Sequence, residues 1–484
     1  MKSTPQRPAL ELLSLPYIAD SLPYFHTIAA QLPMPVMLQS DITPHNSAAE
    51  TSTRGRFDII TAAPEYSLQT HNGKISWTGT APVSLSATDS FATLHAAVTH
   101  MLSNKVDYAA AIQHELPFCG GLIGYCSYDL AREYMPLATT AKKDIDIPDM
   151  QFSFYGWACI QDHKEKKSWL IIHPQCNKEF AQTLPSLFVS QASSTNINQK
   201  PQSTAEFVSN MTNSEYAAKF SAIQEYIHAG DCYQINFAQR FSCRTDQDPI
   251  ELYQHLRGVM PSPFCAFISV QGSTEKTILS FSPERFVQLD ADGIATSQPI
   301  KGTASRHENP QTDAQAALSL QQDPKNLAEN LMIVDLLRND FGKVCEIGSV
   351  TVKKLFELQS FSNVHHLVST IEGKLKPEYN GADLLHACFP GGSITGAPKL
   401  RAMQIIEEME PNRRSIYCGS IVSYSAHGAM DSNIMIRTLL LDEDQLFCWG
   451  GGGIVADSEC NSEYQESFTK VRTLLNALQG NCRH

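Results

Sequence analysis

Three charged residues near the end of the chain have the spacing of a binding site. Glu463, Glu466 and Lys470 stand at positions i, i+3 and i+7, so in a helix they line one face. Two carboxylates one turn apart can hold a hard cation through oxygen, and a lysine one turn further can meet a substrate carboxylate beside it. The alternative is a solvated face with a weak ion pair. Glu329, on another helical pattern, either adds a third carboxylate or marks the edge of the core.

A lysine in an apolar setting is a candidate nucleophile. Lys301 follows Pro-Ile and precedes Gly302. If it is partly buried, its pKa falls and the free amine can attack; otherwise it is a surface ammonium. Glu284, shortly upstream, can give or take a proton. His366 lies on an expected half-buried strand, where a hydrogen-bonded structural histidine is the default, and Arg437 can pair bidentately with a carboxylate.

Two glycine-rich segments permit close approach to a ligand. The first, Phe389-Pro-Gly-Gly-Ser-Ile-Thr-Gly-Ala-Pro398, opens an expected helix, where free N–H groups and the helix dipole favour an anion, and Thr395 adds a hydroxyl. The second is Gly450–Gly453. Neither is a Walker A loop or a dinucleotide fingerprint. A capped turn and a flexible turn remain the alternatives.

The elements that must position these residues point to an α+β fold. Short strand-like runs fill the N-terminal part, whereas the C-terminal part mixes alternating strands with separate helices. Helices are expected at Glu215–Ala229, Ala328–Asn339, Pro398–Glu410 and about Asp457–Leu478. The segment Ser190–Thr204 is polar, which predicts an N-terminal region 1–190, a linker or loop 191–212 and a catalytic region 213–484.

The bulk composition excludes several classes of protein. The net charge of -13 argues against nucleic acid as the main partner. The 13 scattered cysteines contain no Cys-x-x-Cys pair, which favours free thiols in a reducing cytoplasm over a zinc site or disulfide framework. Neither a signal peptide nor an apolar run long enough to span a bilayer is visible. We therefore expect a cytoplasmic protein that does not enter a membrane.

Taken together, these residues resemble the chorismate-utilising enzymes. The resemblance runs in collinear order through about residues 215–475, with a weaker match at residues 118–125. Its blocks are Gly-Asp-Cys-Tyr-Gln-Ile-Asn (230–236), Ser-Pro-Glu-Arg (282–285), Pro-Ile-Lys-Gly-Thr (299–303), residues 328–340, Val-His-His-Leu-Val-Ser (364–369), residues 391–399 and residues 451–470. It implies two large antiparallel or mixed sheets that form a sandwich flanked by helices.

The resemblance also implies roles for individual residues. Glu329 and Glu466, with Glu463 close by, match the Mg2+ ligands. Lys301, Glu284 and His366 match positions at the reacting ring. The positions that match contacts to chorismate, chiefly to its two carboxylates, are Gln234, Thr303, Thr395, Tyr417, Arg437, Gly451, Gly453 and Lys470.

Two positions separate the branches of this family. The water-adding branches have a lysine where Gln234 stands, and Gln has no basic nitrogen to activate water. Anthranilate synthases typically have alanine where Lys301 stands, so Lys301 indicates the branch that aminates chorismate to 4-amino-4-deoxychorismate, a precursor of p-aminobenzoate and folate. This implies a transferase that works through a covalent Lys301 adduct. Anthranilate synthase component I is the alternative, and a non-catalytic paralogue that binds tryptophan or chorismate is a remote one.

The resemblance implies a partner and a second pocket. No cysteine here stands in the Gly-x-Cys-x-Gly elbow of a glutaminase, so ammonia is expected from a separate glutamine amidotransferase subunit in a heterodimer. Three segments resemble the family's tryptophan pocket, with Ser40, Arg56, Phe57, Pro263 and Phe264 as its residues. Gln39 replaces the usual glutamate, so feedback regulation, a structural L-tryptophan and an empty remnant all remain open.

Overall fold

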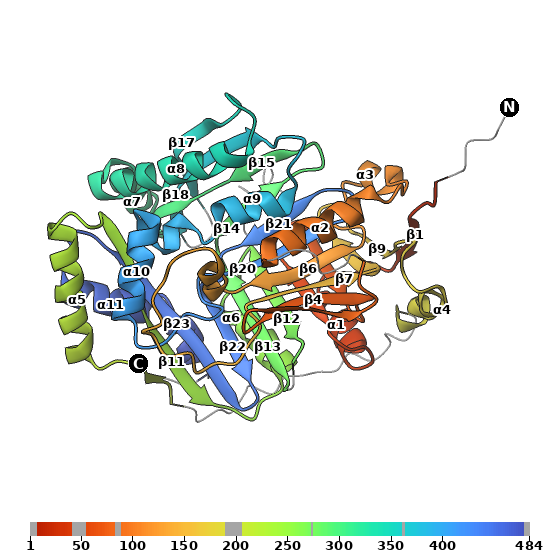
Figure 1. The fold of residues 1–484 in the computed structure, drawn as a ribbon, viewed down its shortest axis with the longest axis horizontal. Coiled ribbons are helices and arrows are strands. Elements are labelled where there is room, and N and C mark those ends of the chain that lie inside the picture. The colour runs from red at the N-terminus through yellow and green to blue at the C-terminus, as the bar shows by residue number, and fades with distance from the viewer. Residues whose placement is uncertain are drawn as a thin grey trace.

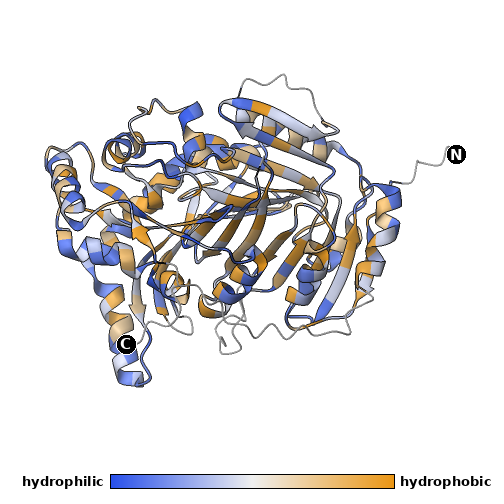
Figure 2. Cartoon of the chain, turned by 90° about the horizontal axis from the view of Figure 1, so that it is seen from below, coloured by the Kyte–Doolittle hydropathy of each residue, from blue (hydrophilic) through white to orange (hydrophobic). Residues whose placement is uncertain are grey.

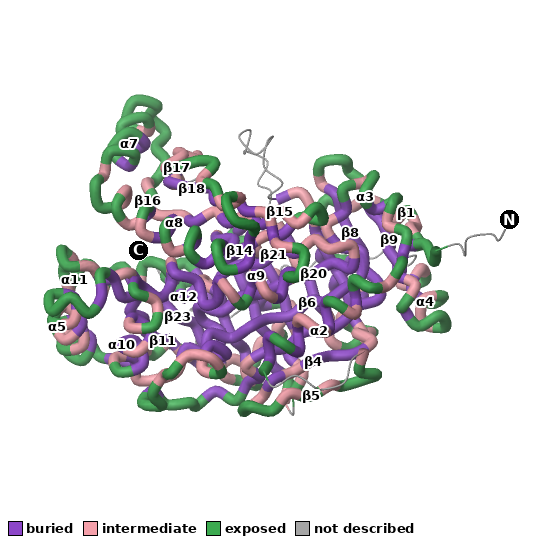
Figure 3. Tube along the Cα trace, turned by 45° about the horizontal axis from the view of Figure 1, so that its top comes forward, coloured by how far each residue is buried: buried purple, intermediate pink, exposed green. Residues whose placement is uncertain are grey.

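Two large β-sheets form the centre of the molecule (Figure 1). The computed structural model describes residues 7–40, 55–82, 89–188, 206–272, 274–360 and 364–478. Figure 2 shows hydrophobic residues running along the central strands. Helices flank the sheets, and peripheral helices such as α5 and α7 contain many exposed residues (Figure 3). The predicted α+β class, with two antiparallel sheets between outer helices, is confirmed.

The first sheet has twelve strands and spans most of the chain. In spatial order it contains β1 (Glu11–Leu15), β9 (Lys167–Ile172), β8 (Trp157–Asp162), β3 (Phe57–Thr61), β2 (Val36–Gln39), β12 (Phe264–Val270), β13 (Lys276–Ser282), β22 (Thr438–Asp442), β23 (Gln445–Ile454), β11 (Gln234–Arg244) and β10 (Val208–Ser209), with β19 (Gly396–Ala397) paired to β11.

The second sheet has eleven strands. Its order is β16 (Ile300–Ser305), β18 (Val364–Lys374), β15 (Ile294–Ser297), β14 (Arg285–Leu289), β21 (Met430–Asn433), β20 (Ser420–Ser425), β6 (Gly121–Cys126), β7 (Met150–Tyr155), β4 (Tyr66–His71) and β5 (Lys74–Gly79), with β17 (Thr351–Ser360) paired to β18. The strand that carries Lys301, β16, therefore lies at one end of this sheet.

Twelve α-helices surround the sheets in the described residues. They are α1 (Leu22–Ala29), α2 (Ser90–Ser103), α3 (Ala109–Gln113), α4 (Lys178–Thr183), α5 (Asn213–His228), α6 (Pro249–Val259), α7 (Pro310–Gln322), α8 (Pro324–Val344), α9 (Gly381–Cys388), α10 (Lys399–Met409), α11 (Cys460–Thr469) and α12 (Arg472–Leu478). Short 3-10 helices occupy Tyr128–Glu133, Leu184–Phe188 and Gly392–Ile394.

The alternation of side chains along the first sheet divides the core into two layers. Ile59 and Ala266 point into the cluster shared with the second sheet, whereas their neighbours Ile60 and Phe267 join a cluster with α1, α6 and α12. Successive side chains of a strand face opposite sides, so this sheet is buried on both faces. A third cluster packs α5 and α10 against β11, next to the glycine-rich strand β23.

The predicted helices are confirmed, with two corrections. α8 begins four residues earlier than expected, because Asp323 caps its first backbone N–H groups, and it ends five residues later, at Val344. The single helix predicted for about Asp457–Leu478 is wrong: the chain forms α11 and α12. At the break Val471 donates its N–H to Phe468 O, three residues back, and this tightened turn redirects α12 so that its leucines enter the second cluster.

Strands from both sides of the polar segment build the same two sheets. β1–β9 precede it and β10–β23 follow it, and each sheet contains members of both groups. Most of the predicted linker 191–212 lies outside the described residues, and the division of the chain at that segment stays a prediction. Within the described residues, every helix is too short or too polar to cross a membrane.

Candidate active site

Lys301 lies on β16, which pairs with β18 across a bulge at Lys301–Thr303. Gly302 has a positive φ of 75°, which a residue with a Cβ would adopt only with strain. The Lys301 ammonium lies 3.5 Å from the carbonyl oxygen of Ser393 in the first glycine-rich loop. Burial lowers the pKa of Lys301, and the charges of Glu329 and Glu284 offset this only in part. The lowered pKa favours the free amine, which is the form of Lys301 that can act as a nucleophile.

Glu284 is a candidate proton-transfer group that shares a hydrogen-bonding partner with this lysine. It is 8% exposed, and its Oε1 accepts a hydrogen bond of 3.2 Å from the Ser393 hydroxyl. Burial raises the pKa of Glu284, while the Lys301 charge acts in the opposite direction. A carboxyl group with a raised pKa can hold a proton near neutral pH and deliver it to a leaving group. Ser393 connects the two groups, and the sequence analysis had not singled it out.

The charges around Lys301 come from four residues in three separate parts of the fold. The charges of Glu329 on α8, Glu284 before β14 and Glu466 near the end of α11 raise the pKa of Lys301. The charge of Lys470, directly after α11, lowers it. The structure therefore gathers the predicted nucleophile, the predicted acid and two of the predicted metal ligands around one space, although they are far apart in sequence.

Two acidic side chains converge on Gly452, near the C-terminal end of β23. Glu463 is 5% exposed; its Oε1 accepts from the Ser458 hydroxyl at 2.7 Å, and its Oε2 has no partner in the described residues. A Cβ at Gly452 would lie 3.0 Å from Glu463 Oε2 and 3.3 Å from Glu466 Oε1. Burial has the largest effect on Glu463 and raises its pKa. The hydrogen bond from Ser458 lowers this pKa, and the charge of Glu466 raises it, so the pKa lies above the ordinary value. Two nearby carboxylates with an unpaired oxygen suit a hard cation.

Glu329 does not complete a closed set of ligands. Among the described residues, no group of three or more His, Cys, Asp or Glu side chains is close enough to share an ion. Mg2+ commonly keeps several waters and takes one or two carboxylates together with substrate oxygens. The pair at Gly452 fits that pattern of an open site.

Two cations face the same space. Arg437 follows β21 with a positive φ of 51°, and no carboxylate lies within 4.0 Å of its guanidinium in the described part of the chain. Burial lowers its pKa, and Glu284 opposes that shift. Lys470 donates to Gly451 O at 2.9 Å and pairs with Glu466 at 2.7 Å. A partly buried arginine without an acidic partner can hold a substrate carboxylate.

The row of glycines on β23 allows close packing on both sides. A Cβ at Gly453 would come within 2.7 Å of Gln234 Nε2, and one at Gly451 within 2.5 Å of Phe237 O. Gln234 is fully buried, and neither of its amide atoms has a hydrogen-bond partner in the described residues. Unpaired buried polar atoms are costly unless water or a ligand meets them. Gln234 is therefore a strong candidate for substrate contact.

The remaining predicted substrate contacts lie at different depths. Thr395 is fully buried and donates its hydroxyl to Gly391 O at 2.9 Å, so the loop itself uses this hydroxyl. Tyr417 is buried, with its ring stacked on Trp449 at 6.1 Å between centroids. Thr303 and His366 pair across β16 and β18, where Thr303 Oγ1 lies 3.0 Å from His366 Nδ1 at the exposed rim. Sequence reasoning missed Trp449, although it precedes the glycine row.

A cavity of about 400 Å3 lies between the two sheets, away from the residues around Lys301. Four of the five residues predicted for a tryptophan pocket line it: Ser40, Phe57, Pro263 and Phe264. Arg56 does not; its guanidinium pairs with Asp162 at 2.8 Å and also with Glu115.

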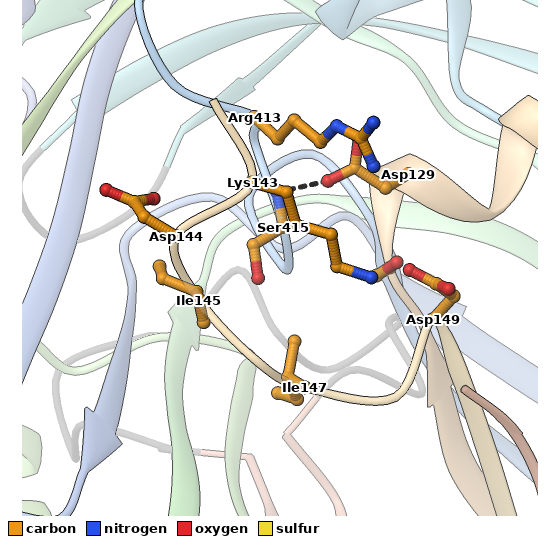
Figure 4. Close-up of a pocket in the computed structure, with 9 residues that line it drawn as sticks. Asp129, Lys143, Asp144, Ile145, Ile147, Asp149, Arg413 and Ser415 are labelled. Atoms are coloured by element: carbon orange, nitrogen blue, oxygen red, sulfur yellow. Dashed lines mark hydrogen bonds between the residues drawn. The ribbon is translucent and has the colours of Figure 1, made fainter. Parts of the chain in front are cut away.

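A second, water-sized cavity of about 10 Å3 is polar and contains none of the predicted site residues (Figure 4). Asp129, Asp149 and Arg413 are among the residues around it, and Asp129 accepts the Ser415 backbone N–H at 2.8 Å.

Comparisons with known proteins agree with this geometry. The family model described as chorismate binding enzyme matches residues 46–476. The chain is 42% identical over 472 residues to aminodeoxychorismate synthase component 1 of Klebsiella aerogenes, covering 97% of this chain and 99% of that one. It is 41% identical to the protein of the same name from Escherichia coli, covering 97% and 98%. The crystal structure of anthranilate synthase component I from Streptococcus pneumoniae superposes with a TM-score of 0.76 at 30% identity, covering 90% of this chain and 95% of that one. On the family match and on both relatives, the chain belongs to the chorismate binding enzyme family.

Proposed function

We propose that this protein aminates chorismate to 4-amino-4-deoxychorismate on the route to p-aminobenzoate and folate. The observation that carries the proposal is the placement of Lys301, a lysine with a lowered pKa beside Glu284 and within the charge cluster of α8 and α11. Relatives named aminodeoxychorismate synthase component 1 share about 40% identity over nearly the whole chain, which supports the same branch.

The proposed reaction uses Lys301 as a covalent nucleophile. Its free amine adds at C2 of the ring, the two ring double bonds shift, and the C4 hydroxyl leaves as water with a proton from Glu284. Ammonia then adds at C4, the double bonds shift back, and the Lys301 amine leaves C2. The surplus proton of the bound ammonia returns to Glu284. Chorismate and ammonia thus give the amino product and water, and one hard displacement becomes two easier ones.

The cations orient the dicarboxylate in this proposal. Arg437 and Lys470 meet the substrate carboxylates, while Gln234 offers its unpaired amide to the reacting face. We propose that Glu463 and Glu466 hold Mg2+, with waters and substrate oxygens as its further ligands, and that Glu329 adds negative charge from α8. When bound, the ion would neutralise substrate carboxylate charge.

Ammonia in this proposal comes from a glutamine amidotransferase subunit. The relatives carry the designation component 1, which supports a separate second component. The sequence has no cysteine in the elbow that such glutaminases use, which agrees with that division of labour. The expected assembly is a heterodimer.

One assay separates this function from anthranilate synthesis. The protein is incubated with chorismate, Mg2+ and ammonium, and the product mass is read. The proposal predicts a species that retains the enolpyruvyl group and carries an amine in place of the hydroxyl. Anthranilate with free pyruvate would overturn it and would make Lys301 a bystander.

We also propose that the 400 Å3 cavity binds L-tryptophan. Its lining is mostly apolar, and it has the size of a small-molecule site. Titration calorimetry with L-tryptophan tests this. Binding that Phe264→Ala weakens would support the proposal, and no heat from protein freshly unfolded and refolded without the ligand would contradict it.

A further inference from the structure

A buried arginine outside the predicted site contacts three of its segments. Arg414 has a side chain that is 1% exposed, and Glu410 holds it through two hydrogen bonds of 2.9 and 2.7 Å. Burial alone would lower the pKa of Arg414, but the charge of Glu410 outweighs this and the pKa lies well above the ordinary value. The guanidinium therefore stays charged, and its two bonds to Glu410 leave further N–H donors for other partners.

Those spare donors reach the glycine-rich loop and strand β11. Nη1 donates to Ile394 O at 2.9 Å, beside Thr395. Nη2 donates to Asn236 O at 2.8 Å, and Asn236 is the register partner of Gly453. The Asn236 N–H in turn donates to Thr395 O at 2.8 Å. One side chain thus fixes the loop and the strand relative to each other.

The aromatic neighbours extend the same contact set. The guanidinium carbon lies 5.6 Å from the centre of the Tyr417 ring and 4.9 Å from that of Tyr128. The Tyr417 N–H also donates to Arg414 O at 3.0 Å. Cation–π contact of a desolvated guanidinium favours one ring position. Three segments that carry predicted substrate contacts therefore meet at one cation.

We propose that Arg414 is a positioning residue that holds the loop 391–398, strand β11 and Tyr417 in the geometry that binds substrate. A buried ion pair alone does not imply such a role, because apolar or neutral replacements of both partners are often tolerated. The distinguishing feature is that the guanidinium makes four contacts with the site segments, namely Ile394 O, Asn236 O, Asn236 Oδ1 at 3.4 Å and the Tyr417 ring, and only two with its ionic partner. The part of this inference that concerns substrate binding rests on the proposed function. The part that concerns the positions of the three segments does not.

The test replaces the ion pair without leaving a buried charge. In Arg414→Met with Glu410→Gln, the glutamine can still accept from Ala238 N, as Glu410 does at 2.9 Å. The matched control is Arg240→Met with Asp144→Asn. It removes another bidentate pair, whose Arg240 lies on β11 and whose two bonds are 2.8 Å, and this pair makes no contact with the loop or with Tyr417 in the described residues.

Two readouts are needed. Amide hydrogen exchange should become faster in peptides covering 391–398 and 415–419 in the Arg414 variant and not in the control. The kcat/KM for chorismate should fall roughly 100-fold, mainly through KM, because the segments are misplaced. The KM for ammonium should not change. If the double variant does not fold, Arg414→Lys, which lacks the planar fork, is judged by the same readouts.

Wild-type exchange in a folded variant would overturn the proposal. So would faster exchange with an unchanged KM for chorismate, which would reduce Arg414 to a stabilising residue. A wild-type protein that does not turn chorismate over would contradict the proposed function instead. The exchange pattern would then decide by itself whether Arg414 fixes these segments.

Discussion

Lys301 and Glu284 share a hydrogen-bonding partner: the carbonyl of Ser393 lies 3.5 Å from the Lys301 ammonium, and the hydroxyl of Ser393 donates to Glu284 at 3.2 Å. The pKa of the lysine is lowered and that of the carboxyl is raised, in both cases chiefly by burial. A base and an acid whose pKa values move towards each other are suited to proton exchange near neutral pH.

Glu284→Gln should lower kcat/KM by roughly 10²–10⁴, the usual range for a lost general acid. The charge of Glu284 raises the pKa of Lys301, so its removal should lower that pKa further. Free amine then persists to lower pH, and the acidic limb of the pH profile of kcat/KM should move to lower pH. Glu275→Gln, an exposed neighbour in sequence, is the control. A profile that only drops in height would argue against the coupling.

Lys301→Met should stabilise the protein by about 1 kcal/mol at neutral pH, as relief of a strained functional site often does. The pKa of Lys301 is lower in the folded protein than the ordinary 10.5, so the unfolded chain binds this proton more tightly. The wild type therefore gains stability as pH rises from the folded pKa towards 10.5, and the advantage of the variant shrinks there. Urea unfolding across pH measures this, with exposed Lys74→Met as control. A variant less stable than the wild type would show that burying the Lys301 ammonium does not destabilise the folded protein.

Glu463→Gln should abolish the stabilisation by Mg2+. In wild type, saturating Mg2+ at 100 times its Kd would add about 2.7 kcal/mol. The variant removes the buried charge whose pKa is raised, so without Mg2+ it should unfold at an equal or higher temperature. Thermal unfolding with and without MgCl2 tests both statements. Glu459→Gln at the exposed start of α11 should behave as wild type, and an intact Mg2+ response in Glu463→Gln would remove Glu463 from the site.

Gly451→Ala should destabilise the protein by about 1–3 kcal/mol, the range for overpacking. Its Cβ would lie 2.5 Å from the backbone oxygen of Phe237, which cannot move without shifting β11. Gly342 in α8 provides the opposite case, because a Cβ there meets nothing within 4 Å. Gly342→Ala should stabilise by about 0.5–1 kcal/mol. Equal effects of the two substitutions on denaturant unfolding would contradict the packing account.

Local sequence signals predicted much of the fold. The helices expected at Glu215–Ala229 and Pro398–Glu410 correspond to α5 and α10 within about two residues at each end. The break between α11 and α12 was missed because it depends on a tertiary demand, the burial of the α12 leucines against α6. The interleaving of early and late strands in both sheets has no local signal either.

The sequence singles out candidate site residues one by one and does not show the contacts between them. Collinear motifs identified Lys301 and Glu284, but not their link through Ser393, since a serine in a glycine-rich loop has no distinguishing pattern. Arg414 was missed for the same reason: a lone arginine reads as a surface residue until its burial is known.

Intact-protein mass spectrometry after brief incubation with chorismate and Mg2+, without ammonia, tests the central claim most directly. We predict an adduct whose mass equals chorismate minus water, mapped by peptide digestion to Lys301, discharged by added ammonium and absent in Lys301→Ala. Undiminished amination by Lys301→Ala would contradict the account, because the covalent role of Lys301 would then be unnecessary.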